Sequence, residues 1–110
     1  MADDHTYTFK AKVWLYAGPT PWHFVTLPKK LGVEIQIFHA QLKKNFGSIG
    51  VKATIGKTSW KTSIFSDKKS GSFVLPLKAD VRKKEKIAAG RTVKVVIAVF
   101  LHGGRLDTFV

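Results

Sequence analysis

The sequence predicts a single domain built mainly from β-strands, and three observations support this class. Apolar and polar residues alternate in several short segments, which is the period of a strand with one buried face. Glycine and proline separate these segments at short intervals. Hydrophobic residues make up 45% of the 110-residue chain, which is enough for one core. We expect the folded domain at 7–101, between a flexible N-terminus at 1–6 and a tail at 102–110.

The first two strands are expected at 7–16 and 22–27. From Tyr7 to Leu15 every second residue is apolar, whereas the intervening positions are mostly threonine and lysine. A segment with one glycine and two prolines separates the strands, and Pro28 ends the second strand.

A helix is predicted at 29–44. The apolar residues there recur at helical spacing, at Leu31, Ile35, Phe38 and Leu42. Val33, Ile35 and Ile37 also alternate, and Gly32 is a poor helix former, so a strand in the first half is the alternative. The glycine-containing segment 47–50 is expected to be a bend.

Two strands at 51–55 and 58–65 are predicted to form a hairpin, because Gly56 and Lys57 between them fit a two-residue turn. A basic turn at 66–71 should lead into a further strand at 73–77.

A short basic helix is expected at 81–87, ended by Gly90. The last strand, 92–101, becomes apolar on both faces, so we expect it to lie inside the sheet rather than at its edge.

The charge of the chain is its main compositional outlier. Lysine and arginine number 19 against seven acidic residues, a formal net charge of +12, which favours anionic partners such as nucleic acid or another polyanion. Sixteen of the 19 are lysine, which suits phosphate attraction better than base-specific readout. There is no cysteine, no signal-like segment and no apolar run long enough to cross a membrane, so we expect a cytoplasmic protein without membrane contact.

No pattern in the sequence predicts a catalytic centre, a metal site or a cofactor. The four histidines are scattered, no serine lies in a nucleophile elbow, and no pair of carboxylates has the arrangement of a general acid and base. We therefore expect a binding or accessory module and not an enzyme.

Clusters of basic residues are the leading candidate for a binding site. Several lie on one strand, the turn after it and one short helix, which suggests at least one patch able to bind phosphate. The candidate nucleic-acid-binding residues are Lys57, Lys61, Lys68, Lys69, Arg82, Lys83, Lys84 and Lys86. Trp14 and Trp60 could add surfaces on which unpaired bases stack, although a tryptophan on a strand more often belongs to the core or the rim of a barrel. We expect binding that tolerates any sequence.

A small-ligand or protein-interaction domain is the alternative function. Its pocket would lie near Trp22, His23 and Trp60, and the lysines would then serve solubility.

One arrangement occurs twice in the chain. Phe24-Val25-Thr26-Leu27-Pro28 and Phe73-Val74-Leu75-Pro76 each place the end of a strand before a helix and a further strand. The second copy, with Val81-Arg82-Lys83-Lys84 and Val93-Lys94-Val95 after it, resembles the swapped-hairpin half of AbrB-type transcription factors. Those halves pair as dimers, so the resemblance implies one chain equivalent to a dimer, and hence a monomer.

At closer range, Trp22-His23-Phe24-Val25-Thr26-Leu27-Pro28, Thr54-Ile55-Gly56 and Thr58-Ser59-Trp60-Lys61-Thr62-Ser63 resemble the bacterial family called domain of unknown function 1905. The segment Leu75-Pro76-Leu77-Lys78-Ala79 extends the resemblance, which covers roughly 7–101. It implies an internally duplicated, six-stranded, double-split pseudobarrel with two capping helices. It implies no established activity.

Overall fold

The alternating segments form seven strands, and two short helices connect them. The computed structural model describes residues 5–40 and 47–100. The strands are β1 (Thr6–Lys12), β2 (Trp14–Tyr16), β3 (Trp22–Thr26), β4 (Ser48–Ile55), β5 (Thr58–Asp67), β6 (Ser72–Pro76) and β7 (Thr92–Val99). The helices are α1 (Lys29–Phe38) and α2 (Ala79–Glu85). All neighbouring strands are antiparallel, in the order β1-β7-β4-β5-β6-β3-β2. The mainly β fold with two helices is confirmed.

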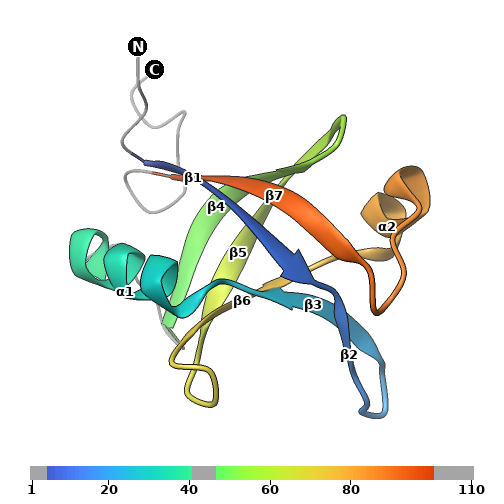
Figure 1. Ribbon diagram of the computed structural model, residues 1–110, viewed down its shortest axis with the longest axis horizontal. Coiled ribbons are helices and arrows are strands. Elements are labelled where there is room, and N and C mark those ends of the chain that lie inside the picture. The colour runs from blue at the N-terminus through green and yellow to red at the C-terminus, as the bar shows by residue number, and fades with distance from the viewer. Residues whose placement is uncertain (1–4, 41–46, 101–110) are drawn as a thin grey trace.

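The strand count is seven rather than six because the first predicted strand breaks at Val13. The Val13 amide donates to the Arg91 carbonyl oxygen (2.8 Å), and the Gly90 amide donates to the Val13 carbonyl oxygen (2.7 Å). On either side of this residue the strand has different partners, β7 for β1 and β3 for β2. Since β1 and β2 also begin and end the strand order, the sheet curls until its two ends meet at Val13 (Figure 1).

The curl gives the sheet an inner face that holds the core and an outer face toward solvent. Alternate residues of β1, β4 and β7 are buried, for example Phe9, Val51 and Ile97. Phe73 and Leu75 from β6 complete the same apolar cluster. The helices lie at opposite ends of the curled sheet (Figure 1).

The first helix begins at Lys29 as predicted but ends at Phe38, before the predicted residues 39 and 40, and the strand alternative is wrong. Within α1 the buried positions are Gly32 and Ile35, whereas Val33 and Ile37 are exposed. The alternating apolar residues therefore do not share one buried face, as they would in a strand. Predicted helix residues 41–44 fall within the segment 41–46, which lies outside the described residues. α2 begins at Ala79, two residues earlier than predicted.

The hairpin turn is confirmed, but the predicted bend at 47–50 is wrong. Gly56 has φ 59°, as the first central residue of a type II′ turn requires. Ser48 belongs to β4 and pairs with Phe65, so most of the predicted bend extends the strand. β7 lies between β1 and β4 and is therefore internal, as expected. The predicted tail at 102–110 lies outside the described residues, and β1 already begins at Thr6.

β3 and β6 pair with matched ends. Val25 lies opposite Leu75, the Leu27 amide donates to the Phe73 carbonyl oxygen (2.9 Å), and the Leu77 amide donates to the His23 carbonyl oxygen (2.9 Å). Each strand then leads within a few residues into a helix.

Gly32 is where α1 meets the sheet most closely. A Cβ atom built on Gly32 would lie 2.8 Å from Cβ and 3.0 Å from Cα of Ser72, which is itself buried. Alanine would favour the helix by about 1 kcal/mol, but the clash with β6 should cost about 1–3 kcal/mol.

We therefore expect Gly32→Ala to lower the free energy of unfolding measured by chemical denaturation. Gln36→Ala, at an exposed position of the same helix, is the control and should leave stability unchanged or slightly raised. If Gly32→Ala were stabilising, α1 would not pack against Ser72 as described.

Candidate functional site

The outer face of the sheet carries a group of exposed lysines. Because side chains of a strand alternate between faces, the lysines of β1, β4, β5 and β7 all fall on the side opposite the core. We call this group the lysine face. It consists of Lys10, Lys12, Lys52, Lys61 and Lys94, all exposed.

Two pairs within the lysine face lie directly opposite each other across neighbouring strands. Lys10 of β1 is paired with Lys94 of β7, and Lys52 of β4 is paired with Lys61 of β5. Directly opposed residues in antiparallel strands have Cβ atoms about 4.5–5.5 Å apart. In each pair two positively charged side chains are therefore attached to directly opposed residues of neighbouring strands.

Acidic residues are nearly absent from these four strands. The one exception is Asp67, at the far end of β5, where its carboxylate accepts a hydrogen bond from the Ser70 amide (3.1 Å). No carboxylate within the four strands is placed to offset the opposed lysines. The outer face near β4 is therefore strongly positive.

A second basic group joins α2 to the β4–β5 turn. The Glu85 carboxylate accepts hydrogen bonds from the Lys57 amide (3.3 Å) and from the Thr58 hydroxyl (2.5 Å), which fixes the helix beside the turn. This brings Lys57 to the same end of the molecule as the four basic residues of α2 and its C-cap: Arg82, Lys83, Lys84 and Lys86.

Two of the α2 side chains already have partners. The Arg82 Nε donates to the Leu77 carbonyl oxygen (3.0 Å), and the Lys84 ammonium lies 3.5 Å from the Asp80 carboxylate. Within the described part of the chain, no ion pair involves Lys83 or Lys86. These two lysines, with Lys57, are the side chains at this end best able to meet an external anion.

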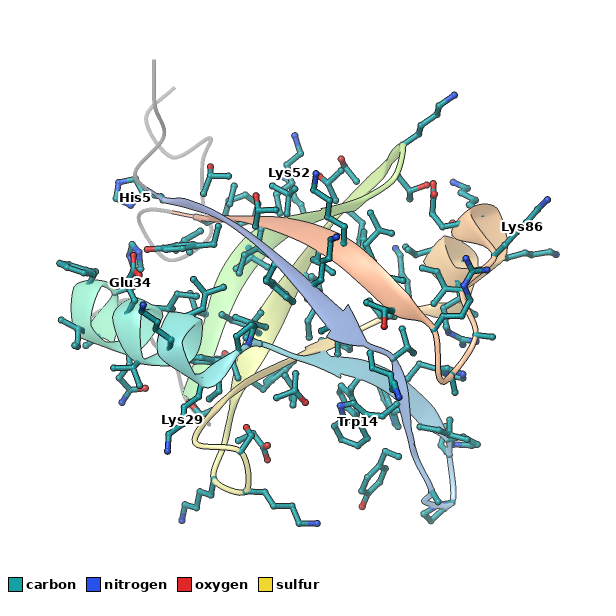
Figure 2. All side chains as sticks on the ribbon, viewed as in Figure 1. His5, Trp14, Lys29, Glu34, Lys52 and Lys86 are labelled. Atoms are coloured by element: carbon teal, nitrogen blue, oxygen red, sulfur yellow. The ribbon has the colours of Figure 1, made fainter. Side chains whose placement is uncertain are left out.

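Lys68 and Lys69 do not join this group. They lie in the β5–β6 turn, at the other end of the ten-residue strand β5, about 33 Å away at the usual rise per residue. The α1 end is basic too, since Lys29 reaches the same turn beside Gly71. Figure 2 shows Lys29 and Lys86 on opposite sides of the molecule. The structure thus divides the predicted basic residues between two ends, and Lys61 belongs to the sheet face between them.

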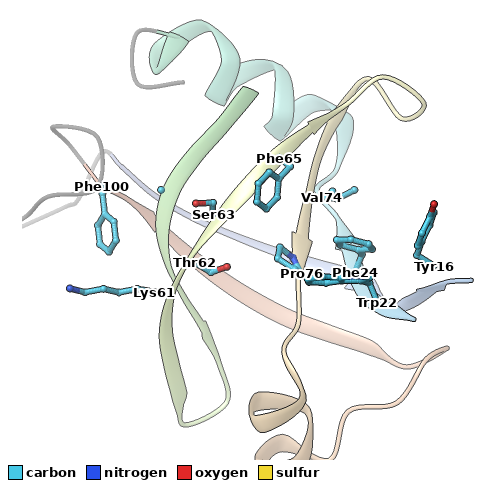
Figure 3. A pocket seen from close by; sticks show the side chains of 11 residues that line it. Tyr16, Trp22, Phe24, Lys61, Thr62, Ser63, Phe65, Val74, Pro76 and Phe100 are labelled. Carbon is cyan, nitrogen blue, oxygen red and sulfur yellow. The ribbon is translucent and has the colours of Figure 1, made fainter. Parts of the chain in front are cut away.

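An open apolar trough of about 760 Å³ lies beside the lysine face on the same outer surface. Its walls are mostly aromatic rings and other apolar side chains, from Tyr16, Trp22, Phe24, Phe65, Val74, Pro76 and Phe100. Lys61, Thr62 and Ser63 add polar groups. Figure 3 shows Lys61 and Phe100 at one end of the trough and Tyr16 at the other.

Contacts between aromatic rings hold one wall of the trough. Phe24 stacks against Trp22 (centroids 6.1 Å apart, planes 13° apart) and lies 5.1 Å from the Trp14 ring. The Trp14 indole nitrogen donates to the Thr26 hydroxyl (2.9 Å), which fixes that ring on β2 against β3. At the other end the Lys61 ammonium lies 5.9 Å from the Phe100 ring centroid, a cation–π contact.

Of the three residues predicted to form a pocket, only Trp22 lines the trough. His23 is its neighbour in β3 and therefore points to the opposite face. Trp60 lies on the inner face of β5 and is 8% exposed, so its ring belongs to the core and offers no stacking surface. Trp14, the other predicted stacking residue, is exposed on the outer face beside the trough.

Two histidines, His23 and His39, contribute little to the positive charge. Burial, with a smaller contribution from Arg82, lowers the pKa of His23, and its Nδ1 has no hydrogen-bond partner among the described residues. Burial and His5 lower the pKa of His39, although Glu34 opposes this shift. His39 Nε2 lies 3.0 Å from the Tyr7 hydroxyl, and its ring packs against His5. Both shifts favour neutral rings near pH 7.

Reasoning from the sequence missed most of the trough and part of the lysine face. The alternation in 7–16 predicts that Lys10 and Lys12 lie on the same face of one strand. It does not predict which other strands lie beside that strand. The pairing of Lys52 with Lys61 follows from the predicted hairpin, since both positions are equidistant from Gly56-Lys57. That signal was present in the sequence and was not used.

Comparison with protein families gives one match. The family model described as "Domain of unknown function (DUF1905)" matches residues 9–97, which is most of the chain and includes the trough except Phe100. No curated protein matches the sequence. Over the described residues, no helix is long and apolar enough to span a membrane.

Proposed function

Because this chain belongs to the DUF1905 family, whose description assigns no function, we propose one from its own surface: it is a binding module for nucleic acid. The lysine face carries the interaction, together with Lys57, Lys83 and Lys86 at the α2 end. Binding relies on the phosphate backbone and tolerates any base sequence. Lysine suits this role because its ammonium attracts phosphate as a point charge, whereas base recognition favours the planar arginine side chain.

The observation that carries the proposal is the opposition of like charges on the lysine face. Like charges directly opposite each other in a sheet destabilise it, by about 0.2–1 kcal/mol per pair. The described strands contain two such pairs, Lys10 with Lys94 and Lys52 with Lys61. A polyanion laid across the face would turn this repulsion into attraction, since each phosphate would neutralise part of the opposed charge.

Solubility alone accounts poorly for this pattern. A surface that only keeps a domain soluble works well with both signs of charge mixed, which also avoids repulsion within the sheet. Here four adjacent strands carry five exposed lysines on one face and a single aspartate at one end. The distribution of charge, more than its total, therefore supports an anionic partner.

We predict that Lys52→Gln with Lys94→Gln weakens binding of both single-stranded and duplex oligonucleotides. If both side chains contact phosphate, the slope of log affinity against log salt should flatten by about 1.8 for a duplex and about 1.4 for a single strand. Fluorescence anisotropy of a labelled oligonucleotide over a range of salt concentrations measures this slope.

The matched control is Lys68→Gln with Lys69→Gln, which removes the same charge from the distant β5–β6 turn. Equal effects of the two double variants would show that net charge alone matters and would contradict a defined lysine face. A parent protein that binds no oligonucleotide at about 50 mM salt, where weak non-specific complexes are favoured, would refute the nucleic-acid function. Tight binding of a small molecule with no salt dependence would favour the alternative of a ligand-binding domain.

We further propose that the fold is a double-split pseudobarrel of the AbrB type, complete within one chain. The matched pairing of β3 with β6, and the helix that follows each of them, support an internal duplication. The sheet ends also meet within the chain at Val13, so no strand from a second copy is needed to close it. Light scattering should therefore give the mass of one chain, and a stable strand-exchanged dimer would contradict this.

A further inference from the structure

The trough and the lysine face adjoin, and together they match the two halves of a nucleotide. Lys61 belongs to both, since it lines the trough and lies directly opposite Lys52. From this continuity we infer that the outer face binds single-stranded nucleic acid, with unpaired bases in the trough and phosphates on the lysines. The inference rests on the proposed function and adds to it the form of nucleic acid and the place of the bases.

The trough exposes aromatic surface that folding alone does not explain. Tyr16 and Trp22 are 53% and 52% exposed, and Phe65 is 38% exposed. All three lie on a surface that turns away from the core, so packing of the core does not require an aromatic ring at these positions. Scattered exposed rings need no explanation, but rings gathered along one hollow mark a site of interaction. The volume of about 760 Å³ is within the usual range of ligand sites, about 300–1,000 Å³.

The shape and chemistry of the trough suit flat, partly polar rings. Its aromatic side chains come from several strands, so successive bases could stack on successive rings. Bases stack in this way on the sheet surface of known RNA-recognition domains. Thr62 and Ser63 also line the trough, and a hydroxyl there can donate to or accept from the edge of any base. A purely hydrocarbon ligand would leave these hydroxyls and Lys61 without partners.

The trough extends across the sheet far enough for more than one base. It runs from β2 to β4, which are separated by β3, β6 and β5 in the strand order. Four steps of about 4.8 Å between strands give about 19 Å. An extended strand could place bases along this length while its backbone continues past Lys61 toward Lys52.

A duplex cannot use the trough in this way. Its bases are stacked on one another and present only their edges in the grooves, so rings on a sheet surface cannot reach their faces. Duplex DNA would contact the lysines alone. The trough should therefore give single strands an advantage that depends on aromatic residues and is nearly independent of salt.

The test measures binding of oligothymidylate of about 12 nucleotides, a length within the usual site size of small single-strand-binding domains, and of a duplex of equal length. We expect Trp22→Ala and Phe65→Ala each to weaken single-strand binding about 5- to 150-fold, the range for loss of one stacked base. Duplex affinity should stay unchanged in both variants. Trp22→Phe keeps a ring and should retain most of the affinity.

Phe38→Ala is the matched control, because Phe38 is an exposed aromatic residue of α1 outside the trough. It should leave single-strand binding unchanged. Melting curves of all variants check that the fold is intact. If Phe65→Ala unfolds, tryptophan fluorescence provides a second measurement, made in a Trp14→Phe background because Trp14 is also exposed beside the trough. Quenching by oligothymidylate should then be largely lost when Trp22 is also replaced by phenylalanine, since Trp60 is buried in the core.

Inorganic polyphosphate separates charge from stacking, since it has phosphates and no bases. We expect it to bind more weakly than oligothymidylate and to be unaffected by Trp22→Ala. Equal affinity for single strand, duplex and polyphosphate, with no effect of the trough variants, would overturn this inference and leave the nucleic-acid function standing. Absence of binding to all three polyanions would overturn both.

Discussion

The architecture depends on the backbone hydrogen bonds of Val13. They tie the bend between β1 and β2, the two strands at the ends of the strand order, to the segment before β7. Val13 is 1% exposed, so these bonds are shielded from water, where an unpaired amide or carbonyl would be costly. Because the sheet curls around this point, its inner face encloses the core. The outer face is then free to carry side chains that the fold does not require.

Two adjoining parts of the outer face carry different kinds of side chain. On the β1, β7 and β4 side the outer positions include lysine and threonine. On the β3 and β2 side they include aromatic rings, next to the apolar Val74 and Pro76 of β6. Both choices carry a cost, since the lysines repel one another across strands and much of the ring surface remains in contact with water. A partner with anionic and planar parts would compensate both costs at once.

Much of the fold could be predicted from the sequence, because local patterns determine it. Alternation located the strands, Gly56 located the hairpin, and helical spacing located α1. The break at Val13 could not be predicted, because the alternation continues through it and only the change of strand partner reveals it. The prediction of a bend at 47–50 was wrong for a related reason, since it also depended on strand pairing. The glycines suggested a turn, but pairing of Ser48 with Phe65 extends β4.

The candidate site was predictable only in part. The sequence identified the basic residues and Trp22, but their grouping depends on contacts between distant segments. Glu85 brings Lys57 to α2, whereas the length of β5 separates Lys57 from Lys68. The sequence left Trp60 open between a binding surface and the core, because its strand alternates polar and apolar residues weakly. Its buried face is clear only once β5 is paired with β4.

Replacing Lys52 by glutamate tests the central claim most directly, because it separates stability from binding. A carboxylate opposite Lys61 replaces repulsion by attraction, so the account predicts a melting temperature that is unchanged or a few degrees higher. The same protein should bind oligothymidylate much more weakly than Lys69→Glu, which makes the same change of charge at the distant turn. Equal affinities of the two variants would contradict the claim that the opposed lysines of the outer face form the binding surface.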